Sequence, residues 1–263
     1  MTKATSLKDS DVQYHIKLAS GQSAPYVIVP GDPGRVPQIA AYLDGAYEVA
    51  NNREYRTFRG RYRGVDVSVT STGIGGPSAA IAVEELIRIG AKVLIRVGTS
   101  GALQEHLQMG DLVVAQSAIR DEGTSCQYVP LAWPASADFE TSLALKTAAE
   151  QQLHQLDTQL NSYVGVVHSK DAFYAEEPKG LPTAAEWTMK WNAWERMGCL
   201  CTEMEAAALF TVAQLHRVKA GAILTVIGET KGGEVKIAKV SSENAIKSAL
   251  EAIYTLAQAE GNA

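Results

Sequence analysis

The sequence has 263 residues, a formal net charge of −5 at neutral pH, 46% hydrophobic and 20% charged residues. A chain of this length and composition buries a full hydrophobic core and is typical of a soluble globular protein. Its apolar runs are too short to span a bilayer, and it has no basic run of the kind that binds nucleic acid. We therefore expect a small-molecule partner, no membrane segment and no nucleic-acid partner.

The cellular location is predicted from the N-terminus and the cysteines. The first stretch, "MTKATSLKDSDVQYH", lacks the apolar core of a secretory signal. The three cysteines, Cys126, Cys199 and Cys201, do not make a disulfide framework. A cytoplasmic location is expected.

Short β-branched runs alternate with longer helical patterns along the chain. Strands are predicted at 26–30, 65–72, 93–98, 111–119, 163–169 and 222–228, and helices after Pro77, near 138–154, and at 184–198, 203–216 and 242–259. This alternation is typical of an α/β fold with a parallel or mixed sheet covered by helices. Because internal repeats and low-complexity linkers are absent from the sequence, residues 1–263 are expected to form one domain. Long connections at 120–137 and 170–185 are expected to hold binding residues.

Three glycine-containing turns follow predicted strands: "VPGDPGR", "STGIGGPS" and "IRVGTSGA". The carboxyl ends of neighbouring strands meet at one rim of an α/β sheet, where ligands usually bind. An arginine fork, a hydroxyl and backbone N–H groups, as offered by Arg35, Arg96 and Thr99, are the groups that hold a phosphate. Arg96 is the strongest single signal, since burying an unpaired guanidinium in an apolar strand is costly.

Other interpretations of these turns stay open or are disfavoured. The second turn, taken alone, is equally well explained as a tight strand-to-helix connection that binds nothing, with Pro77 in the first helical turn. The dinucleotide pattern G-x-G-x-x-G and the Walker sequence are absent from the chain, which argues against a nicotinamide or ATP enzyme.

The segment "CTEMEAAALF" combines a predicted helix start with acidic residues. Thr202 followed by Glu205 fits a capping box ahead of an apolar helix. Glu203 and Glu205 cannot share one helical face, so at most one of them caps the helix while the other points into a pocket. The histidines have no metal-ligand spacing, and the G-x-S-x-G pattern of a serine nucleophile is absent from the sequence.

Taken together, a collinear set of motifs resembles the hexameric type of the nucleoside phosphorylase family, most closely its uridine phosphorylase branch: "PGDPGR", "NREYRTF", "STGIGGPSAAIAVEEL", "IRVGTSGAL", "PLAWPASADFE", "DAFYAEE" and "TEMEAAALF". The resemblance extends from about His15 to the C-terminal helix. It implies a single α/β domain with a mixed, partly closed sheet, dimers that assemble into a hexamer, and the reaction of a nucleoside with orthophosphate to give a free base and a pentose 1-phosphate, without an organic cofactor.

The resemblance also implies roles for individual residues, with Arg35, Arg96 and Glu205 acting in catalysis. The expected phosphate ligands are Gly31, Arg35, Arg96 and Thr99, with Arg53 of the partner subunit. The expected ribose ligands are Glu203, Met204 and Glu205, with His15 of the partner subunit. The expected base neighbours are Phe173, Ser100, Glu177, Lys179 and Glu229. A monovalent cation such as K⁺ is expected at the dimer interface beside Glu54, Ile74 and Ser78.

The sequence departs from this branch where the base is recognised. A glutamine and an arginine usually follow the "FY" pair, whereas Glu177 and Lys179 stand there in this chain, and a further arginine is replaced around Thr230 and Lys231. An ionised glutamate only accepts hydrogen bonds, so it cannot reproduce the amide contact with uracil.

Three functions follow from this departure. Phosphorolysis of uridine is the leading prediction. A purine nucleoside (inosine, guanosine, adenosine or methylthioadenosine) is the alternative substrate, since Glu177 and Glu229 can accept hydrogen bonds from purine N–H groups. A catalytically silent nucleoside-binding module is the alternative of another class, although a pure binder has no need of a buried Arg96.

Overall fold

The computed structural model describes residues 11–156, 158–231 and 234–261, and the side chains of Thr230, Lys231 and Glu234 lie outside that description. The strands are β1 (Tyr26–Pro30), β2 (Asp44–Asn52), β3 (Tyr55–Tyr62), β4 (Val65–Thr70), β5 (Val93–Ala102), β6 (Leu112–Asp121), β7 (Ala135–Ser136), β8 (Ser162–Lys170), β9 (Cys201–Glu203), β10 (Lys219–Lys231) and β11 (Glu234–Ile237). The helices are α1 (Arg35–Ala40), α2 (Gly76–Arg88), α3 (Phe139–Gln155), α4 (Ala184–Arg196), α5 (Ala206–Leu215) and α6 (Glu243–Ala259), with short 3₁₀ turns η1 (Ser125–Gln127) and η2 (Phe173–Glu176).

The sheet is mixed and partly closed, as predicted. Strand β1 pairs in parallel with β4 and β5, and β3 and β2 extend the β4 side in antiparallel order. On the other side β5 pairs with β10, which continues through β6, β8 and β9 back to the last two residues of β5, Gly101 and Ala102. This return closes five strands into a small barrel, while β1 to β4 remain an open wing.

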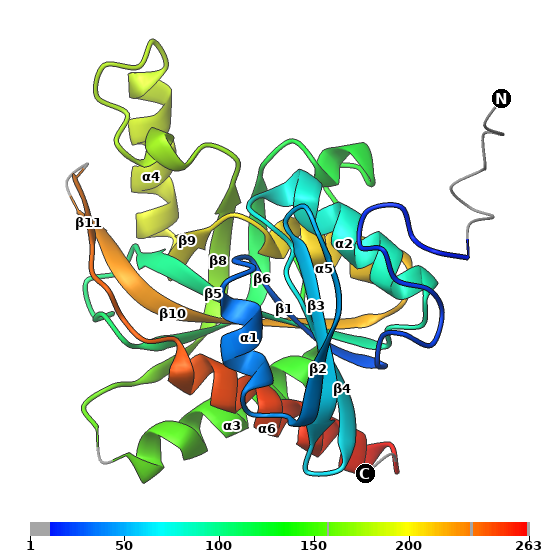
Figure 1. Cartoon of the computed structure of the whole chain (residues 1–263). Coiled ribbons are helices and arrows are strands. Elements are labelled where there is room, and N and C mark those ends of the chain that lie inside the picture. Colours follow the sequence, from blue (N-terminus) through cyan, green and yellow to red (C-terminus); the bar gives the residue numbers. More distant parts are fainter. Residues whose placement is uncertain (1–10, 157, 232–233, 262–263) are drawn as a thin grey trace, which may run out of the picture.

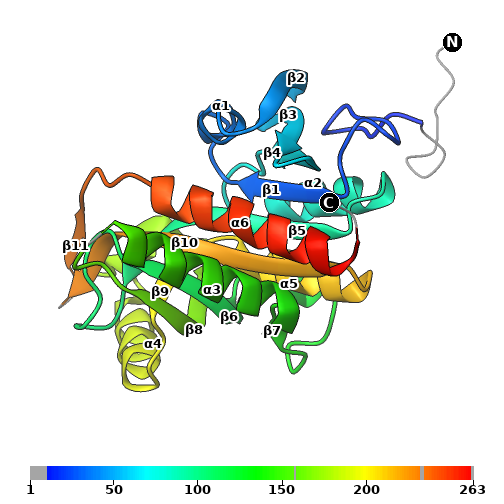
Figure 2. The same cartoon turned by 90° about the horizontal axis from the view of Figure 1, so that it is seen from below.

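Helices cover both faces of the sheet, so its central strands are apolar on both sides. Helices α2 and α5 lie on one face, and α3 and α6 lie side by side on the other with α1 near them (Figure 1; Figure 2). The hydrophobic core therefore has two layers, one under α2 and α5 and the other under α3 and α6. On β5, Leu94 packs in the layer under α2 and α5, whereas Val93 and Ile95 pack in the other, because side chains alternate along a strand.

The predicted elements are confirmed in order, and the structure adds α1, the β2–β3 hairpin, β7, β9 and β11, which the sequence pattern did not reveal. The helix predicted at 203–216 begins only at Ala206, since Cys201–Glu203 pairs with β5 and β8 as β9. Within the described ranges, no helix is both long and apolar enough to cross a membrane.

Candidate active site

Two of the predicted glycine turns, after β1 and β4, meet the glycine-containing second half of β5 at a cavity of about 650 Å³. The third predicted turn is wrong, because β5 continues to Ala102 and its residues stay paired with β10. Gly31 follows β1, Gly73 follows β4, and Gly98 to Gly101 lie in the second half of β5. The wall opposite these turns comes from the chain around β9, from η2 and from the β10–β11 hairpin. The convergence at one rim of the sheet is therefore confirmed.

Close backbone approach explains the glycines of the first two turns. The N–H of Gly73 donates to the carbonyl of Gly31 at 2.9 Å, and a Cβ on Gly31 would stand 3.2 Å from the Gly73 carbonyl oxygen. Gly73 has a φ of +73° and Gly75 a φ of +88°, a conformation that side chains other than glycine rarely adopt. The N–H of Gly75, ahead of α2, donates to Glu205 Oε1 at 2.6 Å, so a carboxylate of this chain already occupies it.

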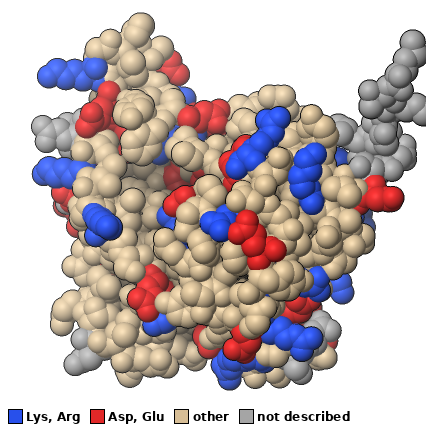
Figure 3. Space-filling model, viewed as in Figure 1, with Lys and Arg blue, Asp and Glu red and all other residues tan. Residues whose placement is uncertain are grey.

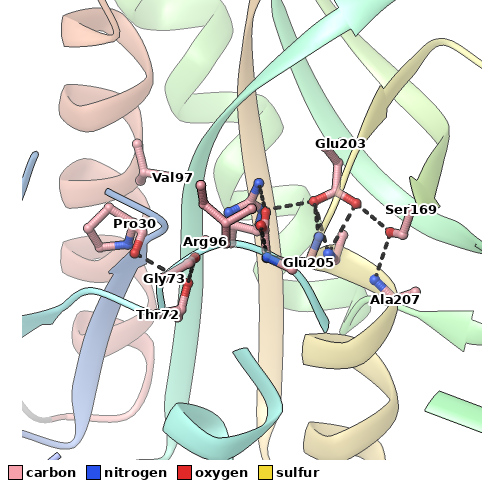
Figure 4. A network of polar contacts seen from close by, with 12 residues as sticks. Pro30, Thr72, Gly73, Arg96, Val97, Ser169, Glu203, Glu205 and Ala207 are labelled. Atoms are coloured by element: carbon pink, nitrogen blue, oxygen red, sulfur yellow. Dashed lines mark hydrogen bonds and ion pairs between the residues drawn. The ribbon is translucent and has the colours of Figure 1, made fainter. Parts of the chain in front are cut away.

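Arg96 is buried at the centre of the cavity wall, with 5% of its surface exposed. Its Nε donates to Glu203 Oε2 at 2.9 Å, and its Nη2 lies 2.5 Å from Glu205 Oε2 (Figure 4). Burial lowers the pKa of Arg96, but the attraction of Glu205 and Glu203 outweighs it, so the net shift is upward. The guanidinium is therefore charged, paired and still able to donate from its remaining N–H groups to a ligand.

One of the two glutamates caps the helix and the other points into the cavity, as the sequence predicted. Glu203 accepts from the backbone N–H groups of Glu205 and Ala206 and from the Ser169 hydroxyl, so it caps α5. Glu205 instead reaches across the cavity to Arg96 and Gly75. Burial raises the pKa of Glu205 and the neighbouring Glu203 adds to the shift, against the opposing effect of Arg96.

The predicted capping box is wrong. Glu205 is itself the N-cap residue of α5 and makes no side-chain capping bond. The Thr202 hydroxyl points to β8, where it lies 3.0 Å from His168 Nδ1 and accepts from Lys170 Nζ at 2.9 Å.

A second arginine completes the positive end of the cavity. Arg35 Nη1 donates to the Val97 carbonyl at 3.1 Å, which fixes the guanidinium beside Arg96. Burial and the charge of Arg96 lower the pKa of Arg35, and Asp32 and Glu205 oppose this effect. Two neighbouring cations with Thr99 in the same wall form a site for an anion.

Most residues expected at the site line this one cavity: Gly31, Arg35, Glu54, Ile74, Ser78, Arg96, Thr99, Ser100, Phe173, Glu203, Met204 and Glu205. The Ser78 hydroxyl donates to the Ile74 carbonyl at 2.9 Å, and a Cβ on Gly73 would stand 2.7 Å from Glu54 Cγ and 3.1 Å from Ser78 Oγ. Glu54, Ile74 and Ser78, the residues expected beside a monovalent cation, thus lie together around Gly73.

His15 and Arg53, both expected to act in a partner's site, do not line the cavity of their own chain. His15 Nδ1 lies 2.7 Å from Glu85 Oε1 on α2, and Asn52 Nδ2 donates to the His15 carbonyl at 2.6 Å. Because Asn52 precedes Arg53 in the β2–β3 turn, His15 and Arg53 share one region of the surface.

The residues expected to read the base, Glu177, Lys179 and Glu229, also lie outside the cavity lining. Glu177 Oε1 accepts from the backbone N–H of Val235 at 2.9 Å, which ties the segment after η2 to β11. Lys179 is exposed, and Glu229 lies 3.9 Å from Lys236 Nζ. Ser100 does line the cavity, and its buried hydroxyl has no hydrogen-bond partner among the described residues.

The sequence analysis missed an ion pair in the same cavity. Lys170 Nζ lies 2.7 Å from Glu176 Oε1, with 1% and 5% of the two residues exposed. Phe173, whose ring centre is 5.7 Å from Lys170 Nζ, stands beside them. The available signal was a lysine at the end of the apolar strand "YVGVVHSK", the same kind of anomaly that revealed Arg96.

The surface around the site is of mixed charge. Figure 3 shows acidic and basic side chains interspersed over the face seen in Figure 1. That face offers no broad basic field to a nucleic-acid backbone.

The fold and this cavity define an α/β protein in which two arginines and two buried carboxylates line one cavity at the rim of the sheet. A sequence profile of the phosphorylase superfamily matches residues 25–258. The chain therefore belongs to the phosphorylase superfamily, which confirms the resemblance to nucleoside phosphorylases and the expectation of a pentosyltransferase.

Individual relatives agree with this assignment. A uridine phosphorylase of Treponema pallidum is 47% identical over 251 residues, which cover 94% of this chain and 95% of the relative. A guanosine phosphorylase of Halorubrum lacusprofundi is 40% identical and covers 93% and 99% of the two chains. A crystal structure of uridine phosphorylase from Vibrio fischeri superimposes with a TM-score of 0.78 at 36% identity, over 94% of this chain and 99% of that one.

Proposed function

We propose that this protein catalyses the reversible phosphorolysis of uridine to uracil and ribose 1-phosphate. The observation that carries the proposal is the single cavity in which Arg35, Arg96 and Thr99 adjoin Glu205 and Met204. Relatives named uridine phosphorylase, at 47% and 37% identity over nearly their whole length, support uridine as the nucleoside.

The arrangement suits a reaction in which phosphate itself is the nucleophile. A phosphate oxygen forms a bond to C1′ of the ribose while the bond from C1′ to N1 of uracil breaks, and the electron pair of that bond leaves with the base. The ribosyl centre becomes cationic on the way, as in glycoside cleavage. The protein therefore needs no activated serine or cysteine, and its contribution is positioning and electrostatic stabilisation.

Within this proposal the paired arginines hold the dianion under C1′. Arg35 and Arg96 donate to the phosphate oxygens with Thr99 and the backbone at Gly31, and Arg53 of the partner subunit closes the clamp. Glu205 accepts from the ribose hydroxyls beside Met204 and Glu203, and His15 of the partner subunit reaches the 5′-hydroxyl. Support comes from the pairing of Arg96 with Glu205 at 2.5 Å, which links the phosphate and ribose ligands directly.

Guanosine is the second candidate substrate, because a guanosine phosphorylase is 40% identical to this chain. The test is release of base by the purified protein from uridine, thymidine, cytidine, inosine, guanosine, adenosine and methylthioadenosine, each with and without phosphate. We expect uracil release that requires phosphate. Release of guanine without release of uracil would overturn the proposal in favour of the second candidate, and binding without turnover would indicate a silent binding module.

We further propose that residues 1–263 act as one phosphorylase-like domain, assembled as dimers within a hexamer, with a monovalent cation beside Glu54, Ile74 and Ser78. The continuous sheet from β2 to β11 supports a single domain, and the shared surface region of His15 and Arg53 supports the dimer. A cytoplasmic location is supported by the thiols of Cys126, Cys199 and Cys201, which are all unpaired.

A further inference from the structure

Glu85 is a buried carboxylate on α2 that has no role in the phosphate and ribose sites described above. Only 6% of the residue is exposed, and it does not line the cavity of its own chain. A glutamate is rarely buried without a partner. Its hydrogen bonds within the described part of the chain all go to His15 and the next residue. The carboxylate therefore serves a segment that we expect to act in the site of the partner subunit.

The hydrogen bonds of Glu85 reach both the backbone and the ring of His15. Oε2 accepts from the backbone N–H groups of His15 at 3.0 Å and Ile16 at 2.9 Å, and Oε1 lies 2.7 Å from His15 Nδ1. From the other side, Asn52 Nδ2 donates to the His15 carbonyl at 2.6 Å. His15 is thus held at its amide, its carbonyl and its ring.

The turn that carries His15 is closed and anchored. The N–H of Gln13 donates to the Leu18 carbonyl at 2.8 Å, and Ile16 and Leu18 are fully buried. Lys17 has a φ of +56°, a conformation that residues other than glycine rarely adopt. Backbone strain of this kind clusters at functional positions and persists because the surroundings hold it. The turn therefore presents His15 in one fixed orientation.

Glu85 also decides which ring nitrogen of His15 carries the proton. An ionised carboxylate only accepts hydrogen bonds, so Nδ1 has to donate and carries a hydrogen. In the neutral ring the other nitrogen, Nε2, is then an acceptor. Nε2 has no hydrogen-bond partner among the described residues, and 26% of the His15 side chain is exposed. Its lone pair is available to a ligand.

Tying down the segment does not by itself explain a charged residue at this position. The amide oxygen of a glutamine accepts from backbone N–H groups as a carboxylate oxygen does, without the cost of burying a charge. A side-chain amide can also rotate and donate to Nδ1, whereas the ionised carboxylate keeps the ring proton there. The presence of Glu85 therefore points to a function of the ring.

We propose that Glu85 is a positioning residue for phosphorolysis. It holds the proton of His15 on Nδ1, so that Nε2 accepts a hydrogen bond from the 5′-hydroxyl of a ribose bound in the partner subunit's site. This inference rests on the proposed function, in which His15 reaches that hydroxyl. It adds a requirement on the substrate, since a nucleoside without a donor at C5′ leaves the lone pair unpaired. Nucleosides with a 5′-thioether, such as methylthioadenosine, are therefore disfavoured.

The first experiment compares kcat/KM for uridine and for 5′-deoxy-5′-fluorouridine, which has nearly the same shape but no donor at C5′. His15→Ala removes the acceptor and gives the intrinsic ratio of the two substrates, including the inductive effect of fluorine. We expect the wild-type ratio to exceed this reference about tenfold, the usual effect of one hydrogen bond whose loss leaves an acceptor unpaired. Equal ratios in wild type and His15→Ala would overturn the proposal.

The second experiment moves the ring proton without removing the histidine. In Glu85→Gln the amide oxygen can accept from the backbone while the NH₂ group donates to Nδ1, which transfers the ring proton to Nε2. We expect the substrate ratio to fall to that of His15→Ala, with no further fall in the double variant His15→Ala/Glu85→Gln. A role confined to tying down the segment would lower both kcat/KM values equally, and an unchanged ratio would contradict the proposal.

A measurement on the wild-type side chain keeps the proposal falsifiable if Glu85→Gln does not fold. In protein with isotopically labelled histidine, the nitrogen resonances that disappear in His15→Ala should show a protonated Nδ1 and a bare Nε2. The opposite pattern would mean that Glu85 does not set the ring proton.

The matched control is Glu84→Gln, a change at the neighbouring glutamate on α2, which also pairs with a histidine. Glu84 Oε2 lies 3.1 Å from His216 Nε2, and both side chains of this pair are more exposed than those of Glu85 and His15. Successive residues of a helix face different directions. Both kcat/KM values and their ratio should therefore stay within about twofold of wild type.

Mixed oligomers test whether Glu85 acts on the neighbouring site. Glu85→Gln is reassembled with an excess of Arg96→Ala, so that most Glu85→Gln subunits have an Arg96→Ala partner. The sites with intact Arg96 then receive His15 from a chain with intact Glu85. After subtraction of the activity of Arg96→Ala alone, the substrate ratio should return toward the wild-type value. A ratio that stays at that of pure Glu85→Gln would confine the effect to one chain and refute the proposal.

Failure of the proposed function is distinguishable from failure of this inference. If wild-type protein releases guanine but no uracil, the same variants are compared on guanosine and 5′-deoxy-5′-fluoroguanosine. If it turns over no nucleoside, the affinities for uridine and 5′-deoxy-5′-fluorouridine are compared by calorimetric titration in the presence of phosphate. In either case, equal substrate ratios in wild type and Glu85→Gln overturn the inference, and a ratio that falls in Glu85→Gln supports it.

Discussion

At the scale of single residues, Arg96 connects the phosphate ligands to the ribose ligands. Arg96→Ala removes a donor to the dianion and leaves Glu203 and Glu205 buried without their cation. We expect kcat/KM for uridine to fall by more than tenfold, which corresponds to about 1.4 kcal/mol. Breaking a buried pair in this way also lowers stability, typically by about 3–5 kcal/mol, so Tm should fall as well.

Arg63→Ala is the matched control for Arg96→Ala. Arg63 Nη1 pairs with Glu251 Oε2 at 3.0 Å, but both side chains are exposed, so neither activity nor Tm should change appreciably. A folded Arg96→Ala protein that keeps more than a tenth of wild-type kcat/KM would show that the arginine clamp is wrong.

His168 makes stability depend on pH in a defined direction. Burial holds its pKa below the ordinary 6.5, so between 6.5 and the folded-state pKa the unfolded chain binds a proton that the folded chain does not. The contribution of His168 to stability is therefore complete above pH 6.5 and is lost as the pH falls through this window. We expect the Tm advantage of wild type over His168→Gln to shrink between about pH 7.5 and about pH 5.5.

Gln155→Ala, at an exposed residue of α3 that carries no titratable group, is the control. Its Tm difference from wild type should stay nearly constant over the same range. A Tm advantage at His168 that grows on acidification would mean that the ring is protonated in the folded protein.

At the scale of elements, strand β5 brings Arg96 into place by leaving room beside it. Arg96 and Gly98 share one face of the strand, and a Cβ on Gly98 would stand 2.7 Å from Arg96 Nη2 and 2.8 Å from Leu224 Cδ2. Gly98→Ala should therefore displace the guanidinium, raise KM for phosphate several-fold and lower stability by about 1–3 kcal/mol. Phosphate titration of initial rates measures the first effect and thermal unfolding the second.

Gly123→Ala provides the comparison, because its added Cβ would meet Asp171 Oδ2 at 3.5 Å, an ordinary contact. Gly123→Ala should change neither the KM for phosphate nor the stability appreciably. Unchanged phosphate kinetics in Gly98→Ala would mean that Arg96 is held by its glutamates alone.

The elements that the sequence revealed are those with a strong period or a buried run. Strand β1 is buried at every position, and α6 shows a continuous apolar face, so both were predicted. Helix α1 was not predicted because it has only six residues and contains Pro37. Strand β2 was not predicted because most of its residues are exposed. Such elements are defined by their neighbours rather than by their own pattern.

The residues of the site also fall into those that local sequence predicted and those that only the tertiary structure brings together. Arg35 follows the glycine turn after β1, and Arg96 and Thr99 lie beside the glycines of β5, so local sequence and the rule for α/β sheets predicted their convergence. Lys170 and Glu176 pair across an irregular connection that has no fixed spacing. Their contact depends on the path from β8 through η2, which only the tertiary structure provides.

At the scale of the whole molecule, the cavity and the groups expected to complete it belong to different surfaces of one chain. His15 and Arg53 sit together outside the cavity, whereas Glu54, the residue after Arg53, lines its edge. A two-fold axis passing near Glu54 would place the first two residues of each chain at the cavity of the other. The cavity is then complete only in the dimer, and a folded monomeric variant should be inactive.

Mixing two inactive variants tests this sharing directly. Arg53→Ala and Arg96→Ala should each be inactive as pure oligomers, because every site lacks one arginine. In a mixed dimer, one site combines the intact Arg96 of one subunit with the intact Arg53 of the other. Random co-assembly should thus restore about a quarter of wild-type activity.

The control for this experiment mixes Arg35→Ala with Arg96→Ala. Both arginines line the cavity of their own chain, so every site in a mixed dimer lacks one of them and no activity should return. Dissociation, mixing and reassembly with each pair of variants, followed by phosphate-dependent uracil release, separates the two cases. Recovery in the first mixture alone places Arg53 in the neighbouring site, whereas absence of recovery in a mixture shown to contain mixed dimers confines the whole site to one chain.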